Sequence, residues 1–307
     1  MALAPPTPRV DADAVTQAGA VAVGVADLRR RPDHGSELIS QTLLGETVRV
    51  LRVGRDRRWL LVAGDEDGYA GWMRSWSLAL GARTEVARWR RAARLVVDRP
   101  WLARADSAGG ALPFGARLAR SRGAARIVGP LGAIELVSGA RPGLTSEPAP
   151  PRGRLLPARG RAMVATAQRF LGVPYHWGGR TFAGLDCSAL VQLAARRIGV
   201  RLPRDARDQC AAVGGPRRLR PLAEALATGP SRGPRPGDAW FFGPGRGEVT
   251  HVALATGGLG LIHAYGRVAW GSLDPLSPVF EPELFRSVLG WGRLTGTPPP
   301  IQKRRER

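Results

Sequence analysis

One cysteine of the chain stands where covalent chemistry is possible: Cys187 follows Asp186 and opens an apolar, helix-compatible stretch over residues 189–197. At a helix N-terminus, unpaired backbone N–H groups and the positive end of the helix dipole favour a thiolate over a thiol. His251 and His263 lie downstream in apolar, strand-like runs that would hold their rings rigidly. A cysteine, a histidine that takes its proton and a third group that orients the histidine form the generalised catalytic triad. These residue types predict nucleophilic catalysis by Cys187.

Two alternatives weigh against this interpretation. A buried cysteine is usually an inert small hydrophobe, and Cys210, which has no glycine-rich approach, fits that description. The surroundings of Cys187 differ, because three glycines there permit close backbone approach: Gly178, Gly179 and Gly184. A zinc site made of Cys187, His251 and His263 is the sharper rival, but no CxxC, HxxH or HExxH spacing supports it. We therefore expect neither a metal nor a cofactor.

Six segments between about residues 161 and 294 resemble the NlpC/P60 cysteine peptidase family in order and spacing. They read Pro-Tyr-His-Trp-Gly-Gly (174–179), Gly-Leu-Asp-Cys-Ser (184–188), Arg-Leu-Pro-Arg (201–204) with Gln209, Arg-Pro-Gly-Asp-Ala-Trp-Phe-Phe (235–242), Thr-His-Val-Ala (250–253) and Ile-His-Ala (262–264). One departure is Ala189, where the family usually has glycine. Alanine is small and favours a helix, so we expect no loss of activity from it.

The resemblance implies an activity and roles for single residues. Family members cleave cell-wall peptides, typically the bond between the γ-carboxyl group of D-glutamate and a diamino acid. By the resemblance, Cys187 is the nucleophile, His251 the base and His263 its orienter. Tyr175 matches a tyrosine whose hydroxyl lies near the nucleophile. The cysteine precedes the histidines, whereas circularly permuted acyltransferase relatives have the opposite order.

Two other functions stay open. One is a different cysteine hydrolase of similar chain order, such as a CHAP-like N-acetylmuramoyl-L-alanine amidase. The other is a non-catalytic cell-wall-binding protein built on SH3-like barrels, against which the intact Cys187, His251 and His263 argue. Product analysis by mass spectrometry separates the two enzymes.

The expected fold is α+β: a papain-like NlpC/P60 catalytic domain, helices first and then an antiparallel sheet with both histidines, preceded by two small all-β SH3-like barrels. Residues 47–53 alternate with period two, and Gly-Tyr-Ala-Gly-Trp at 68–72 resembles a bacterial SH3-like barrel.

A helix is expected from Ala162 to Leu171, and a loop insertion over 214–236. The expected boundaries are 1–20 (disordered N-terminus), 21–82 (first barrel), 85–142 (second, degenerate barrel), 143–159 (linker), 160–296 (catalytic domain) and 297–307 (basic tail).

The composition limits the class of protein and the compartment in which it works. Hydrophobic residues make up 44% of the 307 residues, enough for real cores, and two cysteines leave no disulfide framework. The N-terminus has no positive region followed by a long apolar stretch, so no secretory signal is visible. No run reaches the roughly 18 to 20 apolar residues of a membrane helix. These patterns predict a soluble cytoplasmic protein that does not engage a membrane.

The formal net charge is +21, but the arginines are scattered. The densest basic runs, residues 88–91 and 303–307, lie in no recognisable nucleic-acid module, so we expect no specific nucleic-acid partner. Solvated surface arginines are the first explanation of this charge, and a positive field that concentrates anionic peptides with several carboxylates is the second. The expected partner is a peptidoglycan-derived peptide, bound by a monomer.

The resemblance further implies a preference for peptides with a free N-terminal L-alanine. A buried ammonium group needs anionic partners, because an unpaired buried charge is costly. Asp186 with Ser188 beside it is the first candidate, and Glu37 and Tyr69 are carried over from the barrel motifs. The alternative is that Glu37 is a solvated charge, Tyr69 belongs to the barrel core and Asp186 only caps the helix.

Overall fold

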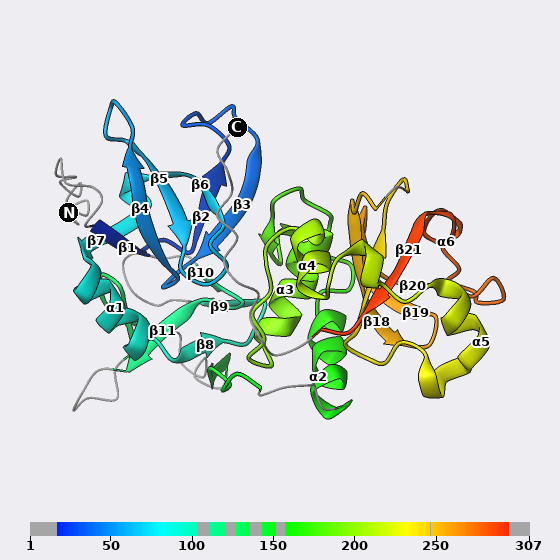
Figure 1. The fold of residues 1–307 in the computed structure, drawn as a ribbon. Helices are drawn as coiled ribbons and strands as arrows, with labels where there is room; N and C mark the ends of the chain where they lie inside the picture. Colours follow the sequence, from blue (N-terminus) through cyan, green and yellow to red (C-terminus); the bar gives the residue numbers. More distant parts are fainter. Residues whose placement is uncertain are drawn as a thin grey trace. The chain divides into compact units, whose positions relative to one another are not determined.

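The computed structural model describes residues 17–103, 111–120, 127–135, 143–151, 157–245 and 247–294. The chain forms two compact units that divide after Glu147. Figure 1 shows the helices and strands of both units. Residues 1–16 of the predicted disordered stretch (1–20) and the predicted basic tail (297–307) lie outside the described residues.

The first sheet of the N-terminal unit contains seven antiparallel strands in the order β3-β2-β6-β5-β4-β1-β7. The strands are β1 (Gln17–Val21), β2 (Val25–Arg29), β3 (Leu38–Leu43), β4 (Thr47–Val53), β5 (Trp59–Gly64), β6 (Ala70–Arg74) and β7 (Leu78–Ala82), with the 3₁₀ turn η2 (Ser75–Ser77) before β7. The sheet begins at Gln17, before the predicted boundary at residue 21. The reason is that β1 pairs on both sides, with β4 and β7.

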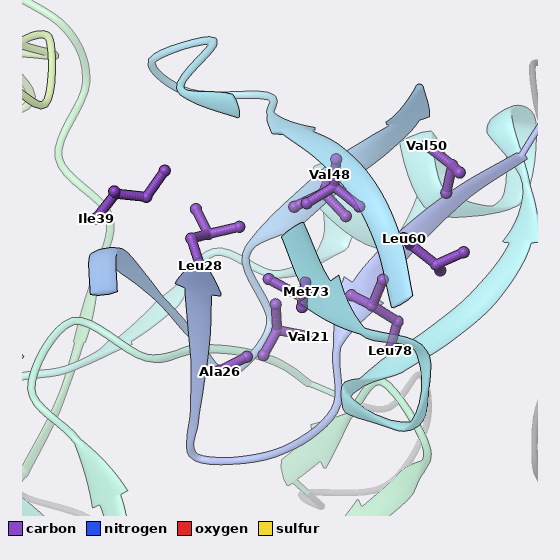
Figure 2. Packing of buried hydrophobic residues seen from close by; sticks show 10 residues of the cluster. Val21, Ala26, Leu28, Ile39, Val48, Val50, Leu60, Met73 and Leu78 are labelled. Carbon is purple, nitrogen blue, oxygen red and sulfur yellow. The ribbon is translucent and has the colours of Figure 1, made fainter. Parts of the chain in front are cut away.

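Alternating side chains build the core of this sheet. In β4, Val48 and Val50 are buried, whereas Arg49 between them is half-buried. Each fully buried aliphatic side chain of this kind contributes about 1.5–3 kcal/mol relative to its exposed state. Figure 2 shows the cluster to which they belong, with Val21, Ala26, Leu28, Ile39, Leu60, Met73 and Leu78.

A helix and a second all-β region complete the N-terminal unit. The sequence analysis did not anticipate α1 (Arg83–Ala92), whose Trp89 donates its indole N–H to the carbonyl oxygen of Gly45 at 2.9 Å. A five-stranded sheet follows, in the order β13-β12-β11-β8-β14, with a separate pair β10-β9. The strands are β8 (Leu95–Val97), β9 (Trp101–Ala103), β10 (Ala111–Pro113), β11 (Arg117–Arg120), β12 (Ile127–Gly129), β13 (Gly132–Ile134) and β14 (Leu144–Ser146).

Part of the predicted linker over 143–159 belongs to this sheet, because β14 pairs antiparallel with β8. The core of the sheet gathers Leu95, Val97, Leu112 and Leu118, all buried. The expectation that small all-β sheets precede the α/β part of the chain is confirmed.

The C-terminal unit places helices before a five-stranded antiparallel sheet in the order β20-β19-β18-β17-β21. Its helices are α2 (Pro157–Gln168), α3 (Cys187–Arg196), α4 (Ala206–Ala212), η4 (Pro216–Arg218), α5 (Leu222–Arg232) and α6 (Pro282–Ser287). Its strands are β15 (Arg180–Thr181), β16 (Gly184–Leu185), β17 (Ala239–Phe242), β18 (His251–Gly257), β19 (Gly260–Tyr265), β20 (Arg267–Ser272) and β21 (Val288–Gly292). As expected from the sequence, the two histidines lie on neighbouring strands of this sheet, and α3 packs against β18 and β19.

Two predicted spans differ from the observed elements. The predicted loop over 214–236 contains η4 and α5, so the loop prediction is wrong. The reason is packing: Ala225 of α5 is buried against Trp240 of the sheet, with Leu222 beside it. The helix predicted from Ala162 to Leu171 is observed as α2, from Pro157 to Gln168. It starts earlier because proline suits a first helical turn. No described helix is long and apolar enough to span a bilayer.

Candidate active site

The approach to Cys187 is a tight hairpin of β15 and β16. Gly178 has a φ of 74°, which favours glycine. At Gly179, an added Cβ would lie 2.5 Å from the carbonyl oxygen of Gly184, and a Cβ at Gly184 would lie 2.6 Å from the Cβ of His176. The close backbone approach predicted for these glycines is confirmed, and it fixes the segment that leads into Asp186.

Helix α3 begins at Cys187 because Asp186 caps it. The Asp186 carboxylate accepts a hydrogen bond from the backbone N–H of Ala189 at 2.8 Å, the usual N-cap contact. The first nine residues of α3 are buried, so the helix is held in the core. The predicted place of the cysteine, at a helix start, is confirmed.

Arg204 completes the surroundings of Asp186 and was given no role by the sequence analysis. Its side chain is 1% exposed. It donates hydrogen bonds to both oxygens of Asp186, at 2.9 Å and 2.6 Å, and to the hydroxyl of Ser188 at 2.8 Å. Burial alone raises the pKa of Asp186, but the charge and hydrogen bonds of Arg204 outweigh it and hold the pKa below its usual range.

The hydrogen bonds of Asp186 bear directly on its predicted amine-binding role. Besides Arg204 and Ala189, the carboxylate accepts from the hydroxyl of Ser188 at 3.0 Å and from the N–H of Gly178 at 3.1 Å. A substrate ammonium group at this place would have to share Asp186 with the guanidinium of Arg204. The helix-capping contact of the alternative interpretation is present, and amine binding by Asp186 stays a prediction.

Cys187 is buried, with 6% of its surface exposed. Burial, and after it the negative charge of Asp186, raise the pKa of its thiol to about 12. Backbone hydrogen bonds from Val252 and Ser188 oppose this rise only in part. The expectation of a thiolate in the free protein is therefore wrong, because loss of hydration outweighs the helix N-terminus.

The two histidines meet across β18 and β19. Nε2 of His251 lies 3.1 Å from Nδ1 of His263, and the two rings meet edge to face. Burial, and after it the neighbouring His263, lower the pKa of His251 to about 3, with Asp186 opposing them. Val252, which follows His251 on β18, carries the N–H that meets the sulfur of Cys187. Cys187 therefore contacts the residue that follows His251 on β18, and His251 in turn contacts His263.

A fourth polar residue, Glu281, lies beyond His263. Its Oε1 is 3.6 Å from Nε2 of His263, a ring that is 2% exposed. Burial lowers the pKa of His263, and Glu281 opposes that effect. No sequence pattern indicated Glu281, which stands before Pro282 at the start of α6 and matches none of the six segments.

Tyr175 lies with the cysteine and the aspartate. Its pKa is raised, first by burial and then by the nearby Cys187 and Asp186. The chain holds it in place through its backbone, because its N–H donates to the carbonyl oxygen of Gly266 at 2.8 Å and it bridges to Leu185. These contacts agree with the predicted position of the tyrosine near the nucleophile.

Three other residues named from the sequence have distinct local surroundings. Cys210 is fully buried in α4, and burial raises its pKa to about 11, which suits a structural cysteine. In the N-terminal unit, Glu37 forms an ion pair with Arg30, and Tyr69 packs against the core of the first sheet. Their role in amine binding stays a prediction. Among the described residues, no three His, Cys, Asp or Glu side chains gather as a metal site.

Curated relatives match parts of the chain. A gamma-D-glutamyl-L-lysine dipeptidyl-peptidase of Bacillus subtilis is 36% identical over 33% of this chain and 31% of its own length. The peptidoglycan endopeptidase RipB of Mycobacterium tuberculosis is 34% identical over 37% of this chain and 46% of its own length. The chain thus spans less than half the length of these relatives.

Solved structures match the fold over nearly the whole chain. An NlpC/P60 family protein from Bacillus cereus superposes with a TM-score of 0.69 at 21% identity, covering 90% of this chain and 99% of the other. An NlpC/P60 endopeptidase from Photobacterium damselae has a TM-score of 0.66 at 15% identity, covering 94% of this chain and 72% of the other. At such identities these matches show the fold alone.

Family models match both units. Residues 28–78 match the bacterial dipeptidyl-peptidase SH3 domain, and residues 172–283 match the NlpC/P60 family. The second match includes Cys187, His251, His263 and Glu281. The chain therefore contains a bacterial dipeptidyl-peptidase SH3 domain followed by an NlpC/P60 domain.

Proposed function

We propose that this protein is a cysteine endopeptidase that hydrolyses the bond between γ-D-glutamate and a diamino acid in peptidoglycan peptides. One observation carries the proposal: the sulfur of Cys187, at the start of α3, meets the N–H of Val252, which adjoins the His251 and His263 pair. A nucleophile, a base and an orienter on rigid elements are the parts that covalent catalysis needs.

The contact between the rings assigns the atoms of His251. Its Nε2 faces His263, so Nδ1 is the nitrogen that serves the cysteine. His251 takes the thiol proton at Nδ1 as the sulfur of Cys187 attacks the amide carbon. It then gives that proton to the leaving amine, and a thioester forms.

In the second half of the reaction, His251 takes a proton from water, and the resulting hydroxide attacks the thioester. The acid product leaves, and the sulfur recovers its proton from His251. In both halves a negative oxygen develops on the carbonyl carbon. Backbone N–H groups at the start of α3, beside Cys187, are the proposed donors to this oxygen.

The two pKa values describe the resting state of this pair. With the pKa of Cys187 raised to about 12 and that of His251 lowered to about 3, the free protein holds a thiol and a neutral imidazole at neutral pH. Proton transfer is therefore coupled to attack on the substrate rather than completed before it. A neutral imidazole is the form that can act as a base.

The choice of bond rests on two supports. The six segments quoted above resemble a family that typically cleaves this bond. The Bacillus subtilis relative, which matches a third of this chain, is named for gamma-D-glutamyl-L-lysine peptides.

Mass spectrometry of the products tests the proposal. The full chain is incubated with L-Ala-γ-D-Glu-diaminopimelate and with the same peptide carrying N-acetylmuramic acid. The proposal predicts release of free diaminopimelate. Cleavage between N-acetylmuramic acid and L-alanine would instead support an amidase. Loss of the rate with a chelator, and its return with zinc, would support the zinc alternative.

A further inference from the structure

The second nitrogen of His263 faces a carboxylate. Oε1 of Glu281 lies 3.6 Å from Nε2 of His263, while Nδ1 of the same ring lies 3.1 Å from Nε2 of His251. The two ring nitrogens of His263 therefore have different partners. Hydrogen bonds of catalytic groups are often longer in the free protein and shorten when substrate binds.

The backbone at Glu281 is fixed on both sides. Its N–H donates to the carbonyl oxygen of Ser272 at the end of β20 at 3.0 Å, and its own carbonyl accepts from the N–H of Phe285 at 2.9 Å. Gly271 leaves room for the side chain, because a Cβ there would lie 3.0 Å from the Cγ of Glu281. The carboxylate is thus held beside His263 by the fold itself.

We propose that Glu281 is a positioning residue that holds His263 in the tautomer with its proton on Nε2. This inference rests on the proposed function, whose orienter it supports. An unprotonated Nε2 would turn its lone pair toward the anionic carboxylate, which is unfavourable, whereas an N–H there is attracted to it. Nδ1 of His263 is then unprotonated and accepts a hydrogen bond.

The tautomer of His263 determines the tautomer of His251, which is the residue that takes the proton of Cys187. If Nδ1 of His263 accepts, His251 must carry its proton on Nε2 and keep Nδ1 unprotonated. Only that tautomer of His251 can take the proton of Cys187. In the opposite arrangement, His251 carries its proton on Nδ1 and cannot act as the base. The charge of Glu281 thus selects the productive arrangement of both rings.

The test compares full-length variants on L-Ala-γ-D-Glu-diaminopimelate. Glu281→Leu is expected to lower kcat by about 10- to 100-fold and to leave KM within about twofold, because the orienter acts in the chemical step. Glu281→Gln is expected to keep more of the rate, since its carbonyl oxygen still accepts from Nε2. Glu283→Leu is the matched control, an exposed glutamate in the first turn of α6, and keeps the full rate.

A second readout does not depend on activity. In the ¹⁵N spectrum of histidine-labelled wild-type protein, Nδ1 of His263 is expected to be unprotonated and Nε2 protonated, and Glu281→Leu is expected to remove this preference. The inference is overturned if Glu281→Leu keeps both wild-type kcat and the wild-type tautomer. If Cys187→Ala is active, the proposed function fails, and the tautomer experiment still decides the role of Glu281.

Discussion

Cys187 and His251 are both uncharged in the free protein at neutral pH, because burial raises the pKa of the thiol to about 12 and lowers that of the imidazole to about 3. The sequence predicted the opposite for the cysteine from its place at a helix start. A helix N-terminus contributes about 0.3–1 kcal/mol at exposed positions. One pKa unit corresponds to about 1.4 kcal/mol. The rise in the pKa of Cys187 is therefore larger than a helix N-terminus can offset, and the loss of hydration on burial dominates.

Alkylation of Cys187 reads this pKa directly. In Cys210→Ser, which leaves one cysteine, the rate with iodoacetamide is expected to rise steadily from about pH 6 to about pH 10. The thiolate is the reacting form, and its fraction grows roughly tenfold per pH unit below the pKa. A rate that levels off below about pH 8 would show that the thiolate is already formed and would contradict the assignment.

Alanine substitution of the two histidines is expected to lower turnover by different amounts. His251→Ala is expected to abolish turnover nearly as fully as loss of the cysteine, because both proton transfers fail. His263→Ala is expected to cost less, since it removes an orienter, and His263→Asn is expected to keep part of the rate. Steady-state kinetics on the free tripeptide measures the order. Equal rates in the two alanine variants would contradict the roles given to them.

At the scale of elements, local sequence patterns predicted α3, β18 and β19, and with them the three central residues. They did not reveal Arg204 or Glu281, because the contacts of both depend on how distant segments fold together: Arg204 lies 18 positions after Asp186, and Glu281 reaches His263 from the start of α6. The helix α5 was missed because glycine, proline and arginine dominate its surroundings. The Leu-Ala-Glu-Ala-Leu-Ala run at 222–227 was the available signal.

The start of α3 depends on Arg204. Arg204→Met is expected to leave Asp186 buried without its counter-charge, which costs about 3–5 kcal/mol. The measurement is hydrogen exchange of the α3 amides, which reports the free energy of opening this helix. Arg207→Met, at an exposed position of the adjacent α4, is the control and is expected to change this free energy by less than about 0.5 kcal/mol. Equal protection of α3 in both variants would show that the ion pair does not hold the helix.

At the scale of the whole molecule, the order of all-β sheets followed by an α/β unit was predictable from turn spacing and from the six segments. The exact limits of these parts were not predictable. Strand β14 lies within the predicted linker because its pairing with β8 joins residues far apart in the chain. Strand β1 begins earlier than predicted for the same kind of reason, since β4 and β7 pair with it.

A preference for peptides with a free N-terminal L-alanine is predicted for the full chain. The free tripeptide is expected to be cleaved at least about tenfold faster than the peptide capped by N-acetylmuramic acid. A tenfold difference in rate corresponds to about 1.4 kcal/mol of transition-state stabilisation. Competition between the two substrates, followed by mass spectrometry, gives the ratio. Glu37→Gln is expected to reduce this ratio, and Glu85→Gln is the control at another glutamate of the same unit. Comparable rates on both peptides would point to wall remodelling.

The central claim is that Cys187 is the nucleophile, and one comparison tests it most directly. Turnover of L-Ala-γ-D-Glu-diaminopimelate is measured for the wild-type protein, Cys187→Ala and Cys210→Ala, the last being the other buried cysteine of the unit. The account predicts that Cys187→Ala releases no detectable diaminopimelate while Cys210→Ala keeps nearly the full rate. An active Cys187→Ala, or an inactive Cys210→Ala with Cys187 intact, would contradict it.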